Sequence, residues 1–243
     1  MHPQLVPQRY AVVSCHVERP LDDRAWAAFS RFQARRPGGF EIAALIRPPD
    51  VSAGESEALW MARARIAAAQ GPLGHHTHWG GPGQARPLDG DPADRVRTEV
   101  AWLRERGFAP RLFCGGGWFM DERVAAVLAE LGYADCTATA FRPGYLSAGA
   151  PRLQLAEPAW LRAGGATLLE LPTTHSLGMA VRSALGPLPA YVHVYFHDSD
   201  LLDRRRRLAL EAALAVLGRR RTPARLDGLA AEVRLEFDAV ARR

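Results

Sequence analysis

Three histidines fall within one short stretch of the chain, GHHTHWGG at residues 74–81. Successive side chains of a strand point to opposite faces, so His76 and His78 would share one face while His75 points to the other. Two neutral imidazoles at this spacing can chelate one divalent cation. The alternative is a structural role, but buried imidazoles need hydrogen-bond partners and make poor core material. The stretch therefore predicts a metal site.

Two further clusters also bring histidine and acidic side chains together near the end of an expected strand. The stretch SCHVE places His16 and Glu18 two residues apart, so an imidazole and a carboxylate can converge on one point, although a surface pair would look the same. The stretch HVYFHDSD ends in acidic residues that would orient the ring of His197. The simplest interpretation of Asp198 and Ser199 is that one of them caps the following helix.

Short apolar runs alternate with helical patterns along nearly the whole sequence, as in βα units around a parallel sheet. The expected strands are residues 10–15, 40–46, 72–79, 111–114, 134–139, 168–171 and 191–196. The expected helices are residues 21–34, 55–70, 93–106, 121–131, 201–217 and 226–239. Because sites in parallel α/β folds are built at the carboxyl ends of strands, this arrangement would gather the histidines at one rim.

The fold expected from this alternation is an α/β fold, a distorted or incomplete (β/α) barrel of about seven parallel strands. No linker or tandem repeat divides the sequence, so residues 1–243 are expected to form one domain, with an irregular segment at 141–165. Apolar residues make up 48% of the chain, enough for a core without disulfides. Cys15, Cys114 and Cys136 are widely spaced without a CxxC pair, which indicates small buried hydrophobes.

The charge and hydrophobicity of the sequence limit the kinds of partner that the protein is expected to bind. The net charge of +5 comes from scattered arginines, and the one dense run, 204–207, fits a solvated helix face, so nucleic-acid binding is not expected. No stretch of about 18 uncharged apolar residues is present, so no membrane span is expected. The start of the chain lacks a basic segment followed by an apolar one, which predicts a cytoplasmic protein. Nothing in the sequence specifies an oligomeric state.

Taken in order, the stretches SCHVE, GHHTHWGG, RLFCGGGWF, LELPTTH and VYFHDSDLL resemble the polysaccharide deacetylase (NodB-like) superfamily over nearly the full chain. The resemblance implies a hydrolase that removes an N-acetyl or other acyl group from a sugar or sugar-containing metabolite. It also implies a divalent metal, zinc or another first-row transition metal. On the family pattern, Glu18, His76 and His78 would hold the metal. His16 would stand in the position of the base and His197 in that of the general acid.

The sequence departs from that family at two coupled positions. The family base is an aspartate held by an arginine, whereas this chain has His16 and Cys114 there. Their joint change is coherent, because a neutral imidazole needs no guanidinium to hold it. The paired histidines of the family are usually separated by three residues, and here one residue separates His76 from His78.

The expected substrate is a small molecule or a glycan. Trp79 and Trp118 follow glycine-rich strand ends and could stack on a sugar ring, and His175 follows a strand and could line the cleft. Two alternatives remain open. One is a glycan-binding barrel that has lost hydrolysis, and the other is a different metal-dependent amidohydrolase, although such folds usually carry their HxH pair on the first strand.

Overall fold

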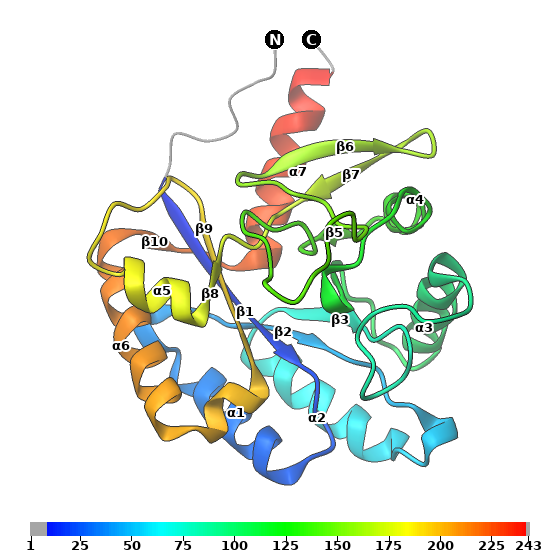
Figure 1. Cartoon of the computed structure of the whole chain (residues 1–243), viewed down its shortest axis with the longest axis horizontal. Helices are drawn as coiled ribbons and strands as arrows, with labels where there is room; N and C mark the ends of the chain where they lie inside the picture. The colour runs from blue at the N-terminus through cyan, green and yellow to red at the C-terminus, as the bar shows by residue number, and fades with distance from the viewer. Residues whose placement is uncertain (1–8, 242–243) are drawn as a thin grey trace.

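The computed structural model describes residues 9–241, so the start of the chain, where the sequence predicts no secretory signal, lies outside the described residues (Figure 1). A curled sheet runs through the molecule. Its strands are β1 (Tyr10–Val17), β2 (Ala43–Ile46), β3 (Leu73–Thr77), β4 (Leu112–Gly115), β5 (Ala134–Asp135), β6 (Ala159–Ala163), β7 (Ala166–Glu170), β8 (His175–Ser176), β9 (Val192–His197) and β10 (Thr222–Pro223).

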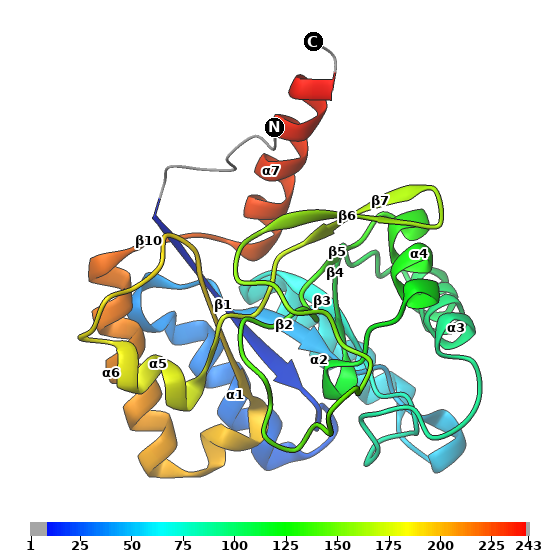
Figure 2. The ribbon, with the colours of Figure 1, turned by 45° about the horizontal axis from the view of Figure 1, so that its top comes forward.

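The strands lie in the order β6-β7-β5-β4-β3-β2-β1-β9-β8, with β10 added beside β1. Within the described residues, every pairing between these strands is parallel except that of β6 with β7. The sheet curls without its two edges meeting, which gives a half-barrel (Figure 2). The prediction of an incomplete (β/α) barrel is confirmed, and the strands beyond the seven predicted from the sequence are β6 and the two-residue strands β8 and β10.

Helices follow most strands, and all of those described except the last, α7, cover the outer face of the sheet. They are α1 (Asp23–Arg35), α2 (Glu57–Gln70), α3 (Pro92–Glu105), α4 (Glu122–Leu131), α5 (Leu177–Ser183), α6 (Arg204–Arg220) and α7 (Leu226–Ala241). The first turn of a helix leaves backbone N–H groups without partners, and a serine or aspartate side chain accepts from them in six cases. These caps are Asp22, Ser56, Asp91, Asp121, Ser176 and Asp203.

Apolar side chains form layers on both faces of the sheet. On the outer face, one cluster joins β1, β2 and β9 to α1, α2 and α6, and another joins β4 and β7 to α3 and α4. The inner face has its own cluster, in which Leu226, Leu229 and Val233 of α7 pack against side chains of β1, β2 and β4. The three cysteines are buried and free, as the sequence predicts. None of the helices within residues 9–241 combines the length and apolarity that crossing a membrane requires.

Two buried carboxyl groups face each other across neighbouring strands on the outer side of the sheet. Asp135 of β5 is in register with Glu170 of β7, and both are fully buried. Burial raises the pKa of Asp135 to about 6, although hydrogen bonds from the backbone amide and the hydroxyl of Thr137 oppose the rise. Burial, followed by the charge of Asp135, raises the pKa of Glu170 well above its usual value. Both groups therefore bind protons more readily in the folded chain than in the unfolded chain.

This pair predicts a pH dependence of stability. Carboxyl groups with raised pKa values in the folded state stabilise it below the unfolded pKa and lose that contribution as pH rises through the folded value. We expect the contribution of this pair to the free energy of unfolding of the parent to fall from about pH 4 through pH 6 and above. Glu170→Gln removes the repulsion, so it should flatten this decline and stabilise the chain at pH 8 by about 1–3 kcal/mol. Urea unfolding of both proteins across this range checks the expectation, and two parallel curves would contradict it.

Candidate metal centre

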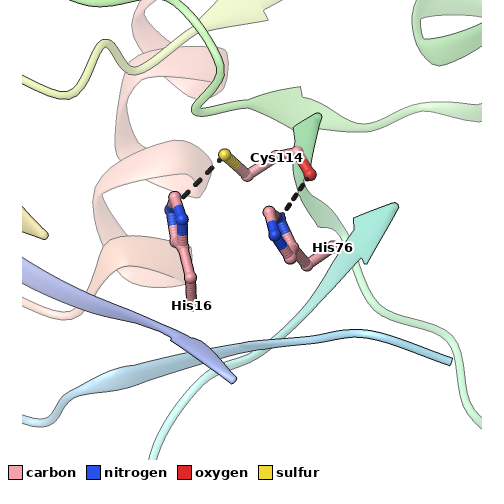
Figure 3. A group of neighbouring side chains, drawn as sticks. All are labelled: His16, His76 and Cys114. Atoms are coloured by element: carbon pink, nitrogen blue, oxygen red, sulfur yellow. Dashed lines mark hydrogen bonds between the residues drawn. The ribbon is translucent and has the colours of Figure 1, made fainter. Parts of the chain in front are cut away.

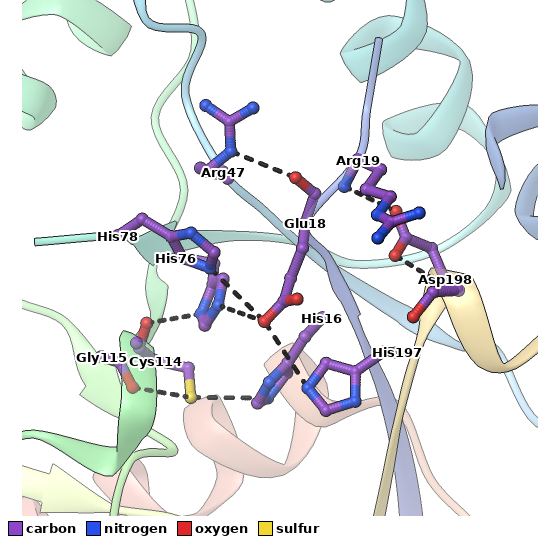
Figure 4. A network of polar contacts seen from close by, with 12 residues as sticks. His16, Glu18, Arg19, Arg47, His76, His78, Cys114, Gly115, His197 and Asp198 are labelled. Atoms are coloured by element: carbon purple, nitrogen blue, oxygen red, sulfur yellow. Dashed lines mark hydrogen bonds and ion pairs between the residues drawn. The ribbon is translucent and has the colours of Figure 1, made fainter. Parts of the chain in front are cut away.

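The sequence-predicted site residues lie at the carboxyl ends of neighbouring strands. His16 lies near the end of β1 and Glu18 directly follows that strand. His76 lies near the end of β3 and His78 directly follows it, while His197 ends β9. The sheet places β9 and β2 on the two sides of β1, with β3 next to β2. The register of β1 and β9 sets His16 opposite His197. All five side chains therefore meet at one rim of the half-barrel (Figure 4).

Glu18 lies at the centre of this cluster. Its Oε1 atom is 3.7 Å from His76 Nε2, 3.4 Å from His78 Nε2 and 3.5 Å from His197 Nε2. Burial would raise the pKa of Glu18, but the surrounding imidazoles together lower it below its usual range. The carboxylate is therefore ionised, and three imidazole nitrogens face one of its oxygens.

Backbone carbonyls fix the orientation of the two β3 histidines. His76 Nδ1 donates to the carbonyl of Cys114 at 2.9 Å, and His78 Nδ1 donates to the carbonyl of Pro82 at 3.0 Å. A carbonyl oxygen only accepts, so each neutral ring has its proton on Nδ1 and a lone pair on Nε2. His76 Nε2 is buried without a hydrogen-bond partner. Two lone pairs and a carboxylate oxygen thus point at each other, an arrangement that a cation between them would satisfy.

The donor set fits a divalent transition metal. Two imidazoles and one carboxylate form a common catalytic zinc set that keeps a position open for water. The donor atoms of Glu18, His76 and His78 lie within 4.8 Å of one another. The same holds for two overlapping groups, His16 with Glu18 and His197, and His16 with His76 and Cys114. The first group is favoured as the metal site, because its two histidines are held in the ligating tautomer.

His75, the residue immediately before His76, has a different environment. Its Nε2 atom lies 2.8 Å from Glu99 Oε2 on α3, and Thr77 Oγ1 donates to the same oxygen. His75 therefore faces the outer side of the sheet, as the alternation of side chains along the strand predicts. It holds α3 on the sheet and takes no part in the cluster.

His16 lies below Glu18, toward the inside of the half-barrel. Its ring stacks on His76 at a centroid distance of 4.6 Å, and its Nε2 atom is 3.5 Å from Cys114 Sγ (Figure 3). Burial, followed by the neighbouring His76 and His197, lowers the pKa of His16 well below its usual value. Burial raises the pKa of the Cys114 thiol. The pair is thus a neutral imidazole and a thiol, not the imidazolium and thiolate that a cysteine nucleophile requires.

His197 has the opposite electrostatic setting. Burial lowers the pKa of its imidazole, but the carboxylates of Asp200 and Glu18 outweigh burial and raise it overall. Asp200 Oδ2 lies 3.7 Å from His197 Nδ1 and accepts from the His197 backbone at 2.9 Å. Arg206 in turn donates to Asp200. The ring therefore holds a proton more readily than His16 does. The sequence-based interpretation of Asp198 was wrong: Asp203 caps α6, and Asp198 accepts from the Arg19 backbone.

A pocket of about 270 Å³ opens onto this cluster. Its lining residues are His16, Glu18, His76, Gln84, Ala85, Arg86, Gly115, Gly117, Trp118, Tyr145 and His197. Trp118 contacts His16 at a centroid distance of 5.3 Å and belongs to this lining, as a sugar-stacking residue must. A larger hollow of about 660 Å³ lies between the loop after β2 and α3, and the five clustered residues do not line it. Of these two pockets, the smaller one is lined by the clustered imidazoles and the Glu18 carboxylate.

The structure places Trp79 and His175 away from this pocket. Trp79 donates its indole N–H to the Gly116 carbonyl at 3.0 Å, packs on Phe119, and lines the larger hollow. His175 pairs with Val194 in the middle of β9, and its Nδ1 atom bonds Thr174 Oγ1 at 2.8 Å. Neither residue is among those that line the smaller pocket.

The sequence pattern indicates some of the remaining pocket residues better than others. Tyr195 alternates with His193 and His197 along β9 and lies against His16 at 5.0 Å between ring centroids, so the strand pattern held a signal for it. Arg86 and Tyr145 reach the pocket from loops, where no periodicity predicts the direction of a side chain.

Comparison of the sequence with models of known protein families and with curated proteins gives no match. Two solved structures have a similar fold. A 4-α-glucanotransferase from Thermococcus litoralis matches with a TM-score of 0.52 and 12% identity over 92% of this chain, which spans only 38% of that enzyme. A Bordetella bronchiseptica protein, provisionally described as a polysaccharide deacetylase involved in O-antigen biosynthesis, matches with a TM-score of 0.50 and 11% identity. That match covers 92% of this chain and 89% of the other. At such identities the likeness shows a shared α/β barrel fold.

Proposed function

We propose that the chain is a metal-dependent hydrolase that removes an N-acetyl or other acyl group from a sugar or a sugar-containing metabolite. The observation that carries this proposal is the convergence of two imidazole lone pairs on the carboxylate of Glu18, at the floor of a pocket. Both structural neighbours are named for reactions of carbohydrates, and the Bordetella protein is described as a deacetylase. The order of the sequence stretches that resemble deacetylases supports the same reaction.

In this proposal the metal ligands are Glu18, His76 and His78, and a bound divalent ion would polarise the acyl oxygen and lower the pKa of water. His16 accepts the proton of the attacking water, because its lowered pKa leaves a free imidazole lone pair at neutral pH. The water oxygen bonds to the acyl carbon and the carbon–nitrogen bond breaks. His197, whose pKa is raised, gives its proton to the departing nitrogen. The products are a carboxylic acid and an amine.

The direct test is an assay of acyl release. Zinc-loaded protein would be incubated with a panel of N-acetylated and O-acetylated sugars, and acetate would be quantified. We expect acetate from at least one N-acetylated amino sugar, loss of that activity with a chelator, and recovery when zinc is returned. Bound zinc without acetate from any member of the panel would contradict the proposal and favour a glycan-binding barrel.

A further inference from the structure

A tight reversal of the chain after β3 brings Arg86 to the pocket. The Gly80 amide donates to the Gln84 carbonyl at 3.0 Å, and the Gln84 amide donates to the Gly81 carbonyl at 3.1 Å. These bonds fold the segment 80–86 back across the rim of the half-barrel. Arg86 therefore lines the same pocket as Glu18, although it lies far from any strand end in sequence.

The glycine-rich turn after β4 holds Arg86 in place. A Cβ atom on Gly117, whose φ is +58°, would lie 2.3 Å from Arg86 Cγ, and one on Gly116 would lie 2.6 Å from the Ala85 carbonyl oxygen. Only glycines permit this close approach. Arg86 Nη1 also donates to the Gly117 carbonyl at 2.6 Å. The turn and the loop are thus fitted to each other, and the arginine stem is fixed.

The guanidinium of Arg86 has no acidic partner among the described residues. Its bonds go to the carbonyls of Gly117 and Pro151, the second at 3.4 Å, and it lies over the Phe119 ring at 5.7 Å. Arg47, by contrast, binds both carboxylate oxygens of Glu55. A half-buried guanidinium with donors left over is a receptor for an anion, because planar N–H groups match carboxylate and phosphate oxygens.

The charges around the pocket agree with this role. Glu18 is the only carboxylate among the described residues that line it, and in the proposed function a divalent cation neutralises it. Tyr145 lines the pocket beside Arg86 and adds a phenolic O–H at the mouth. The pocket volume of about 270 Å³ is at the low end for small-molecule sites, about 300–1,000 Å³, which suits one sugar unit better than a long chain.

We propose that Arg86, with Tyr145, binds an anionic group of the substrate, so that the preferred ligand is an acylated sugar bearing a phosphate or a carboxylate. The inference that the ligand is a sugar rests on the proposed function, whereas the inference that it carries an anionic group rests on Arg86 and its neighbour Tyr145. Phosphate and carboxylate sugars present the same oxygen chemistry to a guanidinium, so the two sources are separated by the choice of ligands.

The test is calorimetric binding at low ionic strength to the zinc-loaded full chain. The ligands are N-acetylglucosamine, its 1-phosphate, and the corresponding N-acetylated uronic acid. We expect at least one anionic ligand to bind on the order of tenfold more tightly than the neutral sugar. Preference for the phosphate alone identifies phosphate recognition, and preference for the uronic acid identifies carboxylate recognition.

Two variants locate the preference. Arg86→Ala should bring anionic and neutral ligands to equal affinity, while Arg86→Lys should keep part of the difference, because it retains the charge but not the planar fork. The matched control is Arg97→Ala, which removes one positive charge from the exposed face of α3, where Arg97 pairs with Glu130. This control should keep the full preference.

Three results would overturn the inference: equal affinities in the parent, a preference that survives in Arg86→Ala, or no binding of any of the three ligands. Acetate measured on the same samples separates this inference from the proposed function. If acetate is released but no anion preference depends on Arg86, the proposed anion site is wrong and the proposed deacetylase function stands. If the anion preference depends on Arg86 but no acetate is released, the anion site stands and the deacetylase function does not.

Discussion

Replacing both His76 and His78 by alanine is expected to abolish divalent metal binding and acyl release. Only Glu18 of the proposed ligands would remain, and a single carboxylate does not hold a transition metal against solvent. Metal polarisation is worth several kcal/mol of transition-state stabilisation, so turnover should fall by about 10²–10⁴ or more. Metal content by elemental analysis, together with acetate release, measures both effects.

The control for this double variant is His175→Ala. It removes a buried histidine that lies outside the pocket, so we expect the parent's metal content. The double variant should also keep its fold, with circular dichroism like that of the parent, because an open catalytic site contributes little to folding. Global unfolding would indicate a structural metal instead. Unchanged metal content would show that the ion, if present, binds elsewhere.

Changing His16 to alanine is expected to remove most turnover without removing the metal. His16 is buried, and the lowered pKa of its imidazole leaves it neutral and able to accept a proton at neutral pH. General base catalysis contributes about 10²–10⁴-fold, so kcat should fall by that factor. Metal content and kcat measured on the same preparation distinguish a role of His16 as general base from a role as metal ligand.

Cys114→Ser is the companion to this variant, because it keeps a small hydrogen-bonding group beside His16. Since burial raises the pKa of the thiol, we expect only a modest loss of activity. A serine variant as inactive as His16→Ala would point to cysteine chemistry. Loss of metal and activity together in His16→Ala would make His16 a ligand, and an unchanged rate with metal retained would remove it from the mechanism.

The sequence predicted the parts of the site that depend on strand periodicity. Two-residue alternation puts His76 and His78 on one face and His75 on the other, and the structure has this arrangement. Parallel strands share one carboxyl edge, so the ends of β1, β3 and β9 had to meet once the strands were recognised. The incomplete barrel followed from the same alternation of strands and helices.

Features set by tertiary packing could not be predicted in this way. The hairpin of β6 and β7 lies partly in the segment 141–165, and its irregular flanks hide a turn at Gly164 and Gly165. Trp79 follows a strand, but its indole turns to the Gly116 carbonyl. His175 belongs to a strand of two residues that pairs halfway down β9. A position after a strand fixes the backbone but leaves the side-chain direction to its neighbours.

Arg86 is the clearest example of a pocket residue that local sequence patterns do not predict. Its loop has no periodicity, and its place at the pocket depends on contact with Gly117, a residue 31 positions away in sequence. In the sequence, the glycines after β4 mark the strand end that Trp118 follows, where that residue could stack on a sugar ring. In the structure the group that comes close is this arginine, so the same glycines serve the packing of the protein itself.

The most direct test of the metal centre is anomalous diffraction from crystals of the zinc-loaded chain, recorded on both sides of the zinc absorption edge. We expect one strong peak at the rim of the half-barrel, about 2.0–2.2 Å from Glu18 oxygen and from the Nε2 atoms of His76 and His78. A peak at another group of side chains, or none within ligand distance of these three residues, would contradict the account.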